Sequence, residues 1–234
     1  MSKNPFLKRA YRLKNQQDTL SMYGDWAATY DQTMKDHDYQ SPRRIVEALL
    51  RHCADKSVAI FDVGCGTGLS GMALAKAGFT EIDGSDVSPE MIEIARQLPG
   101  VYRQLTCVTL DDPFPFPDGA YQVITAMGVI ADQHAPPRTI GQLLNKLHTG
   151  GLLIFSLNNH TLENPDYLQA CHDAVTDGIA IILEDHDEPH MVKLGMKSKI
   201  MMNKKRICHK LFGTNLVWHL PCGGSDRGKF AGLI

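Results

Sequence analysis

Three glycines at alternate positions, Gly64, Gly66 and Gly68, stand where an apolar run ends. The run from Val58 to Val63 is typical of a buried strand, and apolar residues at helical spacing follow the glycines. Because glycine has no Cβ, such a turn can adopt positive φ and bring backbone N–H groups close to a ligand. A tight connection is the alternative, but it rarely needs three glycines. The turn therefore predicts a site for a nucleotide-like ligand.

A carboxylate ends the next predicted strand, Glu81 to Ser85, at Asp86. Its distance along the chain from the glycine turn suits an acid that accepts hydrogen bonds from two ribose hydroxyls. The dinucleotide fingerprint G-x-G-x-x-G needs a third glycine where this chain has Leu69. That mismatch disfavours a nucleotide-dependent oxidoreductase, which we keep as an alternative.

Strands and helices alternate around these residues. Besides the strands at 58–63 and 81–85, apolar runs predict strands at 102–110, 121–127 and 151–157. Helices are expected at 68–77, after Ser88-Pro89, and at 138–147 and 164–175. This order predicts an α/β fold with a doubly wound, mostly parallel sheet, whose ligands bind beyond the carboxyl ends of the strands. The residues up to 205 are expected to add antiparallel edge strands.

The N-terminal part carries aromatic residues at near-helical spacing, Tyr23, Trp26 and Tyr30, and a second helix is expected from Pro42 to Leu50. These residues form either a packed core or a helical lid over the site. We divide the chain into an extension at 1–19, a main domain at 20–205 with the lid at 20–50, and a tail at 206–234 of unknown structure.

Composition excludes several classes of protein. The apolar and charged fractions, 43% and 21%, are ordinary for a globular domain, and a net charge of −2 gives no field for nucleic acid. The apolar runs are too short to span a membrane, and the scattered cysteines predict free thiols in the cytoplasm. We expect no metal, because the spacing of the quartet Cys208, His209, His219 and Cys222 matches no closed zinc site.

Three segments of the chain carry a family resemblance: FDVGCGTG from Phe61, GSDVSPEM from Gly84, and PFPDG from Pro115. Together they resemble class I S-adenosylmethionine-dependent methyltransferases over residues 20–160. YGDWAATYD from Tyr23 and MGVI from Met127 are similar to the Williams-Beuren-region methyltransferase-like subgroup.

The resemblance implies a seven-stranded sheet with S-adenosylmethionine over its carboxyl edge, and it assigns roles to matching residues. The turn, with Gly64, Cys65, Gly66 and Gly68, is expected to approach the methionine part of the cofactor. Asp62 is expected to hold its ammonium group, and Asp86 its ribose. Val87 and Met91 are expected to flank the adenine, and Met127 to close the pocket.

One family feature that concerns the cofactor's adenine is missing from the chain. Where the resemblance implies an acid that reaches the adenine amino group, we align Thr109, with Asp111 and Asp112 beyond it.

Methyl transfer from a sulfonium requires the protein chiefly to align the reactants. An acceptor hydroxyl or protonated amine must also lose a proton, for which His134 and His160 are candidates, with surface or packing histidines as the alternative. We expect a small, partly apolar acceptor under the lid, bound by Trp26 and Tyr30, and a monomeric protein. A protein that binds the cofactor or a partner without catalysis is a further alternative, because the motif does not reveal an acceptor pocket.

Overall fold

The structure, a computed structural model, describes residues 5–10, 16–109, 112, 114–132 and 134–206. Its seven-stranded sheet has the order β3-β2-β1-β4-β5-β7-β6. The strands are β1 (Ile60–Val63), β2 (Ile82–Asp86), β3 (Gln104–Cys107), β4 (Val123–Ala126), β5 (Leu152–Asn158), β6 (Ala180–Pro189) and β7 (Lys197–Lys205). All five strands predicted from apolar runs are present, most of them shortened at their ends.

The first five strands are parallel, and β7 and β6 are antiparallel to their neighbours. The predicted doubly wound sheet is therefore confirmed. The prediction that the last strands lie at the edge is right only for β6, because β7 lies between β5 and β6. The inner place suits β7 because it buries the apolar side chains of Ile200, Met201 and Met202 completely.

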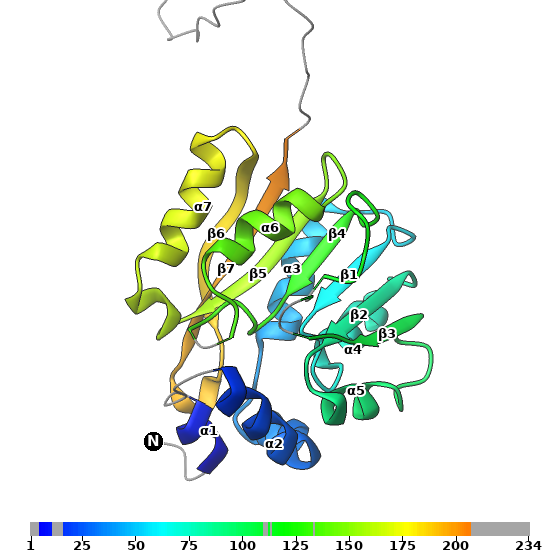
Figure 1. The fold of residues 1–234 in the computed structure, drawn as a ribbon, viewed down its shortest axis with the longest axis vertical. Coiled ribbons are helices and arrows are strands. Elements are labelled where there is room, and N and C mark those ends of the chain that lie inside the picture. Colours follow the sequence, from blue (N-terminus) through cyan, green and yellow to red (C-terminus); the bar gives the residue numbers. More distant parts are fainter. Residues whose placement is uncertain (1–4, 11–15, 110–111, 113, 133, 207–234) are drawn as a thin grey trace, which may run out of the picture.

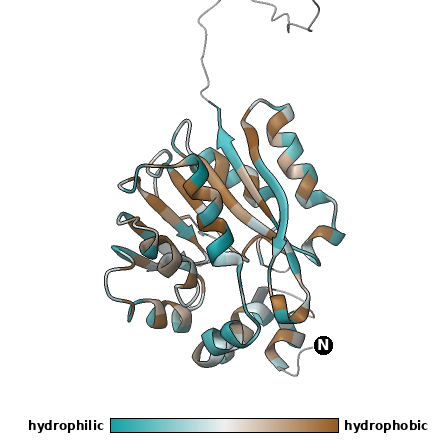
Figure 2. Ribbon diagram, turned by 180° about the vertical axis from the view of Figure 1, so that it is seen from behind, coloured by the Kyte–Doolittle hydropathy of each residue, from teal (hydrophilic) through white to brown (hydrophobic). Residues whose placement is uncertain are grey.

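Helices cover both faces of the sheet (Figure 1). Those after the N-terminal pair are α3 (Ser41–His52), α4 (Leu69–Lys76), α5 (Pro89–Ala95), α6 (Arg138–Lys146) and α7 (Asp166–Thr176). One core cluster joins α6 and α7 to the sheet through residues such as Leu143 and Phe155. Another joins α3 and α4 to the opposite face through Leu49 and Ile154. Apolar residues accordingly line the central strands, whereas polar residues face outward on the helices (Figure 2).

Two N-terminal helices, α1 (Pro5–Ala10) and α2 (Gln16–Asp36), lie beyond the carboxyl ends of the parallel strands (Figure 1). Because α2 begins at Gln16, the boundary predicted at residue 20 falls inside a helix. The two helices share a small apolar cluster with Trp26 and Met22. α2 packs against α5 near Gly24, where an added Cβ would stand 3.2 Å from Glu90 Oε2. The N-terminal segment therefore covers the end of the sheet where ligands of this fold bind.

The last predicted segment lies almost wholly outside the described residues, which end at Arg206. The predicted tail from 207 onward, with the quartet of Cys and His residues considered as a metal site, is among the residues left undescribed, as is Asp111.

Candidate active site

The three glycines after β1 all have positive φ: +62° for Gly64, +55° for Gly66 and +97° for Gly68. They differ in what an added Cβ atom would contact. A Cβ on Gly64 would overlap Val129, and one on Gly68 would overlap Leu98. A Cβ on Gly66 would meet nothing within 4 Å. Gly66 therefore borders open space, whereas the other two allow close packing of the turn.

Asp86, at the end of β2, is held against this turn by backbone hydrogen bonds. Its Oδ2 accepts from the N–H of Gly66 at 2.8 Å, and its Oδ1 accepts from the N–H of Ser88 at 2.9 Å. Burial raises the pKa of the carboxyl group, and these hydrogen bonds oppose the rise. Ser88 in turn caps α5 by accepting from the N–H of Met91 at 3.3 Å, as the Ser-Pro sequence predicts.

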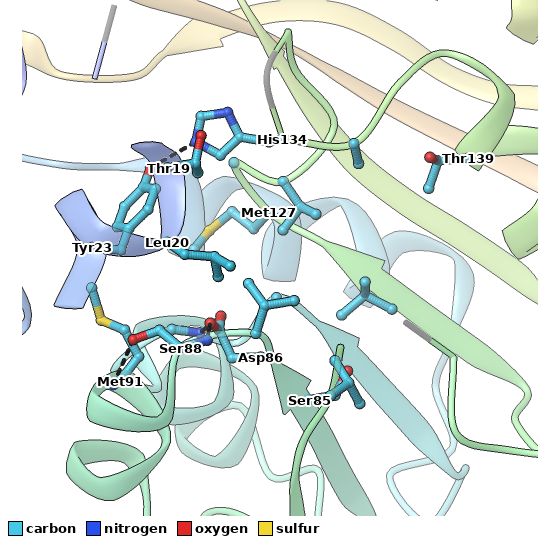
Figure 3. A pocket seen from close by; sticks show the side chains of 18 of the residues that line it. Thr19, Leu20, Tyr23, Ser85, Asp86, Ser88, Met91, Met127, His134 and Thr139 are labelled. Carbon is cyan, nitrogen blue, oxygen red and sulfur yellow. Dashed lines mark hydrogen bonds between the residues drawn. The ribbon is translucent and has the colours of Figure 1, made fainter. Parts of the chain in front are cut away.

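A first cavity of about 430 Å³ opens over the turn and Asp86. Figure 3 shows Asp86, Ser88 and Met91 on one side of it, with Met127 and His134 across from them. The sequence-predicted residues that line it are Gly64, Gly66, Asp86, Val87, Met91, Met127, Tyr30 and His134. Further lining residues that the motifs did not indicate include Thr19, Leu20, Ser85, Val108 and Phe114.

Ser85 is a polar residue of this cavity that the sequence analysis missed. Its hydroxyl is almost completely buried and has no hydrogen-bond partner in the structure. Burying a hydroxyl without a partner costs free energy, so such a group indicates a place where a ligand completes the hydrogen bonding. Ser85 directly precedes Asp86 at the end of β2. No sequence pattern marks a serine in a strand as a ligand-binding residue, because side chains there alternate between the two faces of the sheet.

Asp62 does not lie where the resemblance implies. It is 0% exposed and does not line the first cavity. Three hydroxyls donate to its carboxylate: Ser70, Tyr102 at 2.8 Å, and Thr125 at 2.7 Å. Burial raises its pKa, and these three bonds lower it. In this structure Asp62 ties β1 to α4 and β4 through these hydrogen bonds.

Two other predicted cofactor residues, Cys65 and Gly68, also lie outside the lining of the first cavity. The Cys65 thiol is buried, which raises its pKa well above the usual value, and the N–H of Cys65 donates to the carbonyl of Ser85. The pattern of alternate glycines does not distinguish residues that face a ligand from residues that pack the turn.

Thr109, which we align with the acid that the chain lacks, lies away from the first cavity. Thr109 is exposed, does not line the first cavity, and accepts a hydrogen bond from the N–H of Asp112 at 3.3 Å. The neighbouring Val108 is buried and does line the cavity, so the chain contributes an apolar side chain there.

The N-terminal helix α2 contributes directly to the site. Asp31 accepts a hydrogen bond from Thr67 of the glycine turn, which fixes α2 to that turn. Tyr30 lines the first cavity, but Trp26 does not. Trp26 is only 2% exposed, stacks on Phe6 at 5.7 Å between ring centroids, and donates to Thr33. Trp26 is therefore mainly a packing residue, and its small exposed part borders a second cavity beside the first.

His134 stands at the wall between the two cavities. Its Nδ1 lies 2.9 Å from the carbonyl oxygen of Asp132, which can only accept, so Nδ1 carries the proton. Its Nε2 then accepts from the Tyr23 hydroxyl at 3.1 Å (Figure 3). Burial lowers the pKa of the ring. His134 is thus a neutral imidazole with its basic nitrogen on the side of Tyr23.

His160, the other predicted proton acceptor, lies at a more exposed position. It lines only the second of the two cavities, and its Nδ1 faces Glu163 at 3.5 Å. Of the two predicted histidines, the structure places His134 at the first cavity and His160 away from it.

No helix within the described ranges is long and apolar enough to cross a membrane. This result concerns residues 5–206 with their gaps.

Comparisons with known proteins give one consistent result. The profile of the family described as "Methyltransferase domain" matches residues 34–199. Human "Methyltransferase-like protein 27" is 33% identical over 172 residues, which are 71% of this chain and 69% of that protein. "Ubiquinone biosynthesis O-methyltransferase" of Methylococcus capsulatus is 32% identical over 108 residues, 44% of each chain.

Among solved structures, the magnesium protoporphyrin IX methyltransferase of Synechocystis, with bound S-adenosylmethionine, has a TM-score of 0.61 at 17% identity. The match covers 82% of this chain and 98% of that one. At this level of identity the likeness confirms the fold, including the seven-stranded sheet, and nothing finer.

Proposed function

Because the chain belongs to the class I S-adenosylmethionine-dependent methyltransferases, we propose that its first cavity holds S-adenosylmethionine and that the acceptor is a small molecule. The observation that carries this proposal is the junction of Gly66 and Asp86. Gly66 has positive φ and borders open space, and its N–H donates to the Asp86 carboxylate at the end of β2. This combination suits a ligand that brings a ribose close to the backbone.

The residues of the first cavity fit the cofactor. Asp86 is placed to accept from the ribose hydroxyls, and the Ser85 hydroxyl, which lacks a partner, is available for a polar group of the ligand. Val87, Met91 and Val108 offer apolar surface for a flat base, and Met127 lies across the cavity from Met91 (Figure 3). When bound, S-adenosylmethionine supplies a methyl carbon on a sulfonium, and the electron pair of the broken C–S bond stays on sulfur.

The chain's own part in the reaction is to exclude water, position the reactants and remove a proton where the acceptor needs it. Helix α2 covers the cavity through Tyr23 and Tyr30. His134 is the residue that we assign to proton removal, with Nε2 as the accepting atom once the acceptor's hydroxyl replaces the Tyr23 hydroxyl that donates to it in this structure. Proximity and orientation can lower the barrier by about 7 to 11 kcal/mol. A monomeric state and a cytoplasmic location stay predictions from the sequence.

Calorimetric titration of the purified protein tests the proposal. We expect S-adenosylmethionine and S-adenosylhomocysteine to bind with micromolar affinity, about −8 kcal/mol. NADH is the control, because Leu69 replaces the third glycine of the dinucleotide fingerprint. Binding of NADH without binding of S-adenosylmethionine would overturn the proposal in favour of an oxidoreductase. Tight binding of S-adenosylmethionine with no transfer to a broad acceptor panel would favour a non-catalytic binding protein.

The protonation state of His134 can be measured without knowing the acceptor. We expect NMR titration of labelled histidine to give His134 a pKa below the ordinary 6.5, because burial disfavours the charged ring. Nitrogen shifts should show the proton of the neutral ring on Nδ1, as the carbonyl of Asp132 requires. A proton on Nε2 would exclude this nitrogen as the proton acceptor, and a pKa above 6.5 would contradict the expected effect of burial on the ring.

A further inference from the structure

A second cavity of about 360 Å³ lies next to the first and shares part of its wall. Its volume falls in the range of about 300 to 1,000 Å³ that is typical of small-molecule sites. The shared wall consists of Tyr23, Tyr30, Gly128 and His134, which line both cavities. A ligand in the second cavity therefore lies against residues that also line the first cavity, His134 among them.

One part of the lining of the second cavity is aromatic and sulfur-containing, and polar residues such as Asn158 and Thr161 form another part. Tyr39 and Trp26 border it together with the methionines Met34 and Met191. These side chains come from α2, from the residues just after it, and from the turn that follows β6. Aromatic and thioether groups offer flat, polarisable surface to an apolar ring.

A buried histidine is one of the polar residues of this cavity. His190 is 6% exposed and borders the second cavity but not the first. Its Nδ1 is engaged with the Ser41 hydroxyl at 2.8 Å, and no described residue partners Nε2. This nitrogen is therefore placed to make a hydrogen bond with a ligand.

The charges of the second cavity argue against an ionic ligand. No lysine or arginine of the described part of the chain lines it, so an anionic ligand finds no strong counter-charge. Burial lowers the pKa of His190 to about 4, so this ring is neutral at neutral pH. The two acids at the cavity, Asp132 and Glu163, are exposed, and they interact with Tyr167 and His160. Exposed carboxylates attract a cation only weakly, because water screens them.

We propose that the second cavity binds the methyl acceptor, and that this acceptor is a neutral molecule with a flat aromatic ring that carries a hydroxyl group. The inference rests on the proposed function, since it needs the methyl donor in the first cavity. The aromatic residues of the lining contact the ring, and Nε2 of His190 binds a polar substituent of the acceptor. The acceptor's hydroxyl then lies at the shared wall, next to His134.

The test uses naphthalene-2,6-diol as the probe and calorimetry as the readout. The diol should bind the protein loaded with S-adenosylhomocysteine, and naphthalene-2-carboxylate and 2-naphthylmethylamine should bind at least about tenfold more weakly, since each brings a charge that the cavity does not neutralise. Tighter binding of either charged analogue, or no binding of the diol, would overturn the proposed acceptor class.

A variant that fills the second cavity separates this inference from the proposed function. Ala131 lines the second cavity only and is 9% exposed. Ala131→Phe should weaken binding of the diol by about tenfold or more, since it occupies the space of the ring, and leave the affinity for S-adenosylhomocysteine within about twofold. Ala54→Phe, the same change at an exposed position outside both cavities, should alter neither. Unchanged diol binding in Ala131→Phe would contradict the inference.

His190→Asn provides a second variant in case Ala131→Phe does not fold. Its amide can keep a hydrogen bond to Ser41, but it removes Nε2. We expect diol affinity to fall about fivefold or more, which corresponds to one lost hydrogen bond. Unchanged affinity would overturn the role of His190. If the wild-type protein fails to bind S-adenosylhomocysteine, the proposed function falls as well, whereas failure of the diol alone overturns only this inference.

Discussion

Replacing Asp86 with alanine is expected to weaken the binding of S-adenosylmethionine by about 1.5 to 3 kcal/mol, which is a tenfold to hundredfold rise in the dissociation constant. The carboxylate is the acceptor that we assign to the ribose hydroxyls, and hydrogen bonds to a charged group are the stronger kind. Burial raises the pKa of Asp86, so this carboxylate is protonated at a higher pH than an ordinary aspartate. On acidification, the affinity of the wild-type protein should therefore begin to fall at that higher pH. Calorimetric titration at several pH values measures both effects.

The Asp86 variant also loses two acceptors for backbone N–H groups, at Gly66 and Ser88. Thermal unfolding must therefore be recorded, and the titration made well below the melting temperature. Glu93→Ala is the matched control, because Glu93 is an exposed acid of α5 that lines neither cavity. Wild-type affinity in Asp86→Ala, with the fold intact, would exclude Asp86 from the ribose site.

Asp62→Ala should have its main effect on stability. The change removes the common acceptor of three hydroxyls in a place with 0% exposure. A buried hydroxyl left without a partner costs about 1 to 3 kcal/mol, and some of the three can rotate to other acceptors. We therefore expect the free energy of unfolding to fall by about 3 kcal/mol, measured by chemical denaturation.

Asp173→Ala is the control for this change, because Asp173 is an exposed acid on α7. The comparison separates a structural role of Asp62 from the ammonium-binding role that the family resemblance implies. A variant with unchanged stability and lost affinity for S-adenosylmethionine would show that the implied role is correct and that the cluster of hydroxyls is incidental.

The fold could be predicted from the sequence because each of its signals is local. Buried parallel strands appear as continuous apolar runs, and glycine, proline and serine mark where helices begin and end. Ser88-Pro89 is one example, since the serine caps α5 as expected. The position of β7 inside the sheet was not predictable in this way, because strand order depends on which faces the whole chain must bury.

The candidate site was predictable where backbone conformation or strand position decides it, and not where packing decides it. Asp86 and Gly66 come together because two adjacent parallel strands end at the same edge. Asp62 lies on the strand before the same turn, but its side chain points to Ser70 and Thr125, which the motif does not include. Ser85 and the second cavity depend on contacts between segments far apart in the sequence, so local patterns carry no sign of them.

A crystal structure of the complex with S-adenosylhomocysteine would test the proposed cofactor site most directly. We expect the ligand in the first cavity, with its ribose hydroxyls about 2.5 to 3.0 Å from the Asp86 carboxylate and its base beside Val87 and Met91. A ligand bound elsewhere, or one in the first cavity with its ribose turned away from Asp86, would contradict the site proposed here.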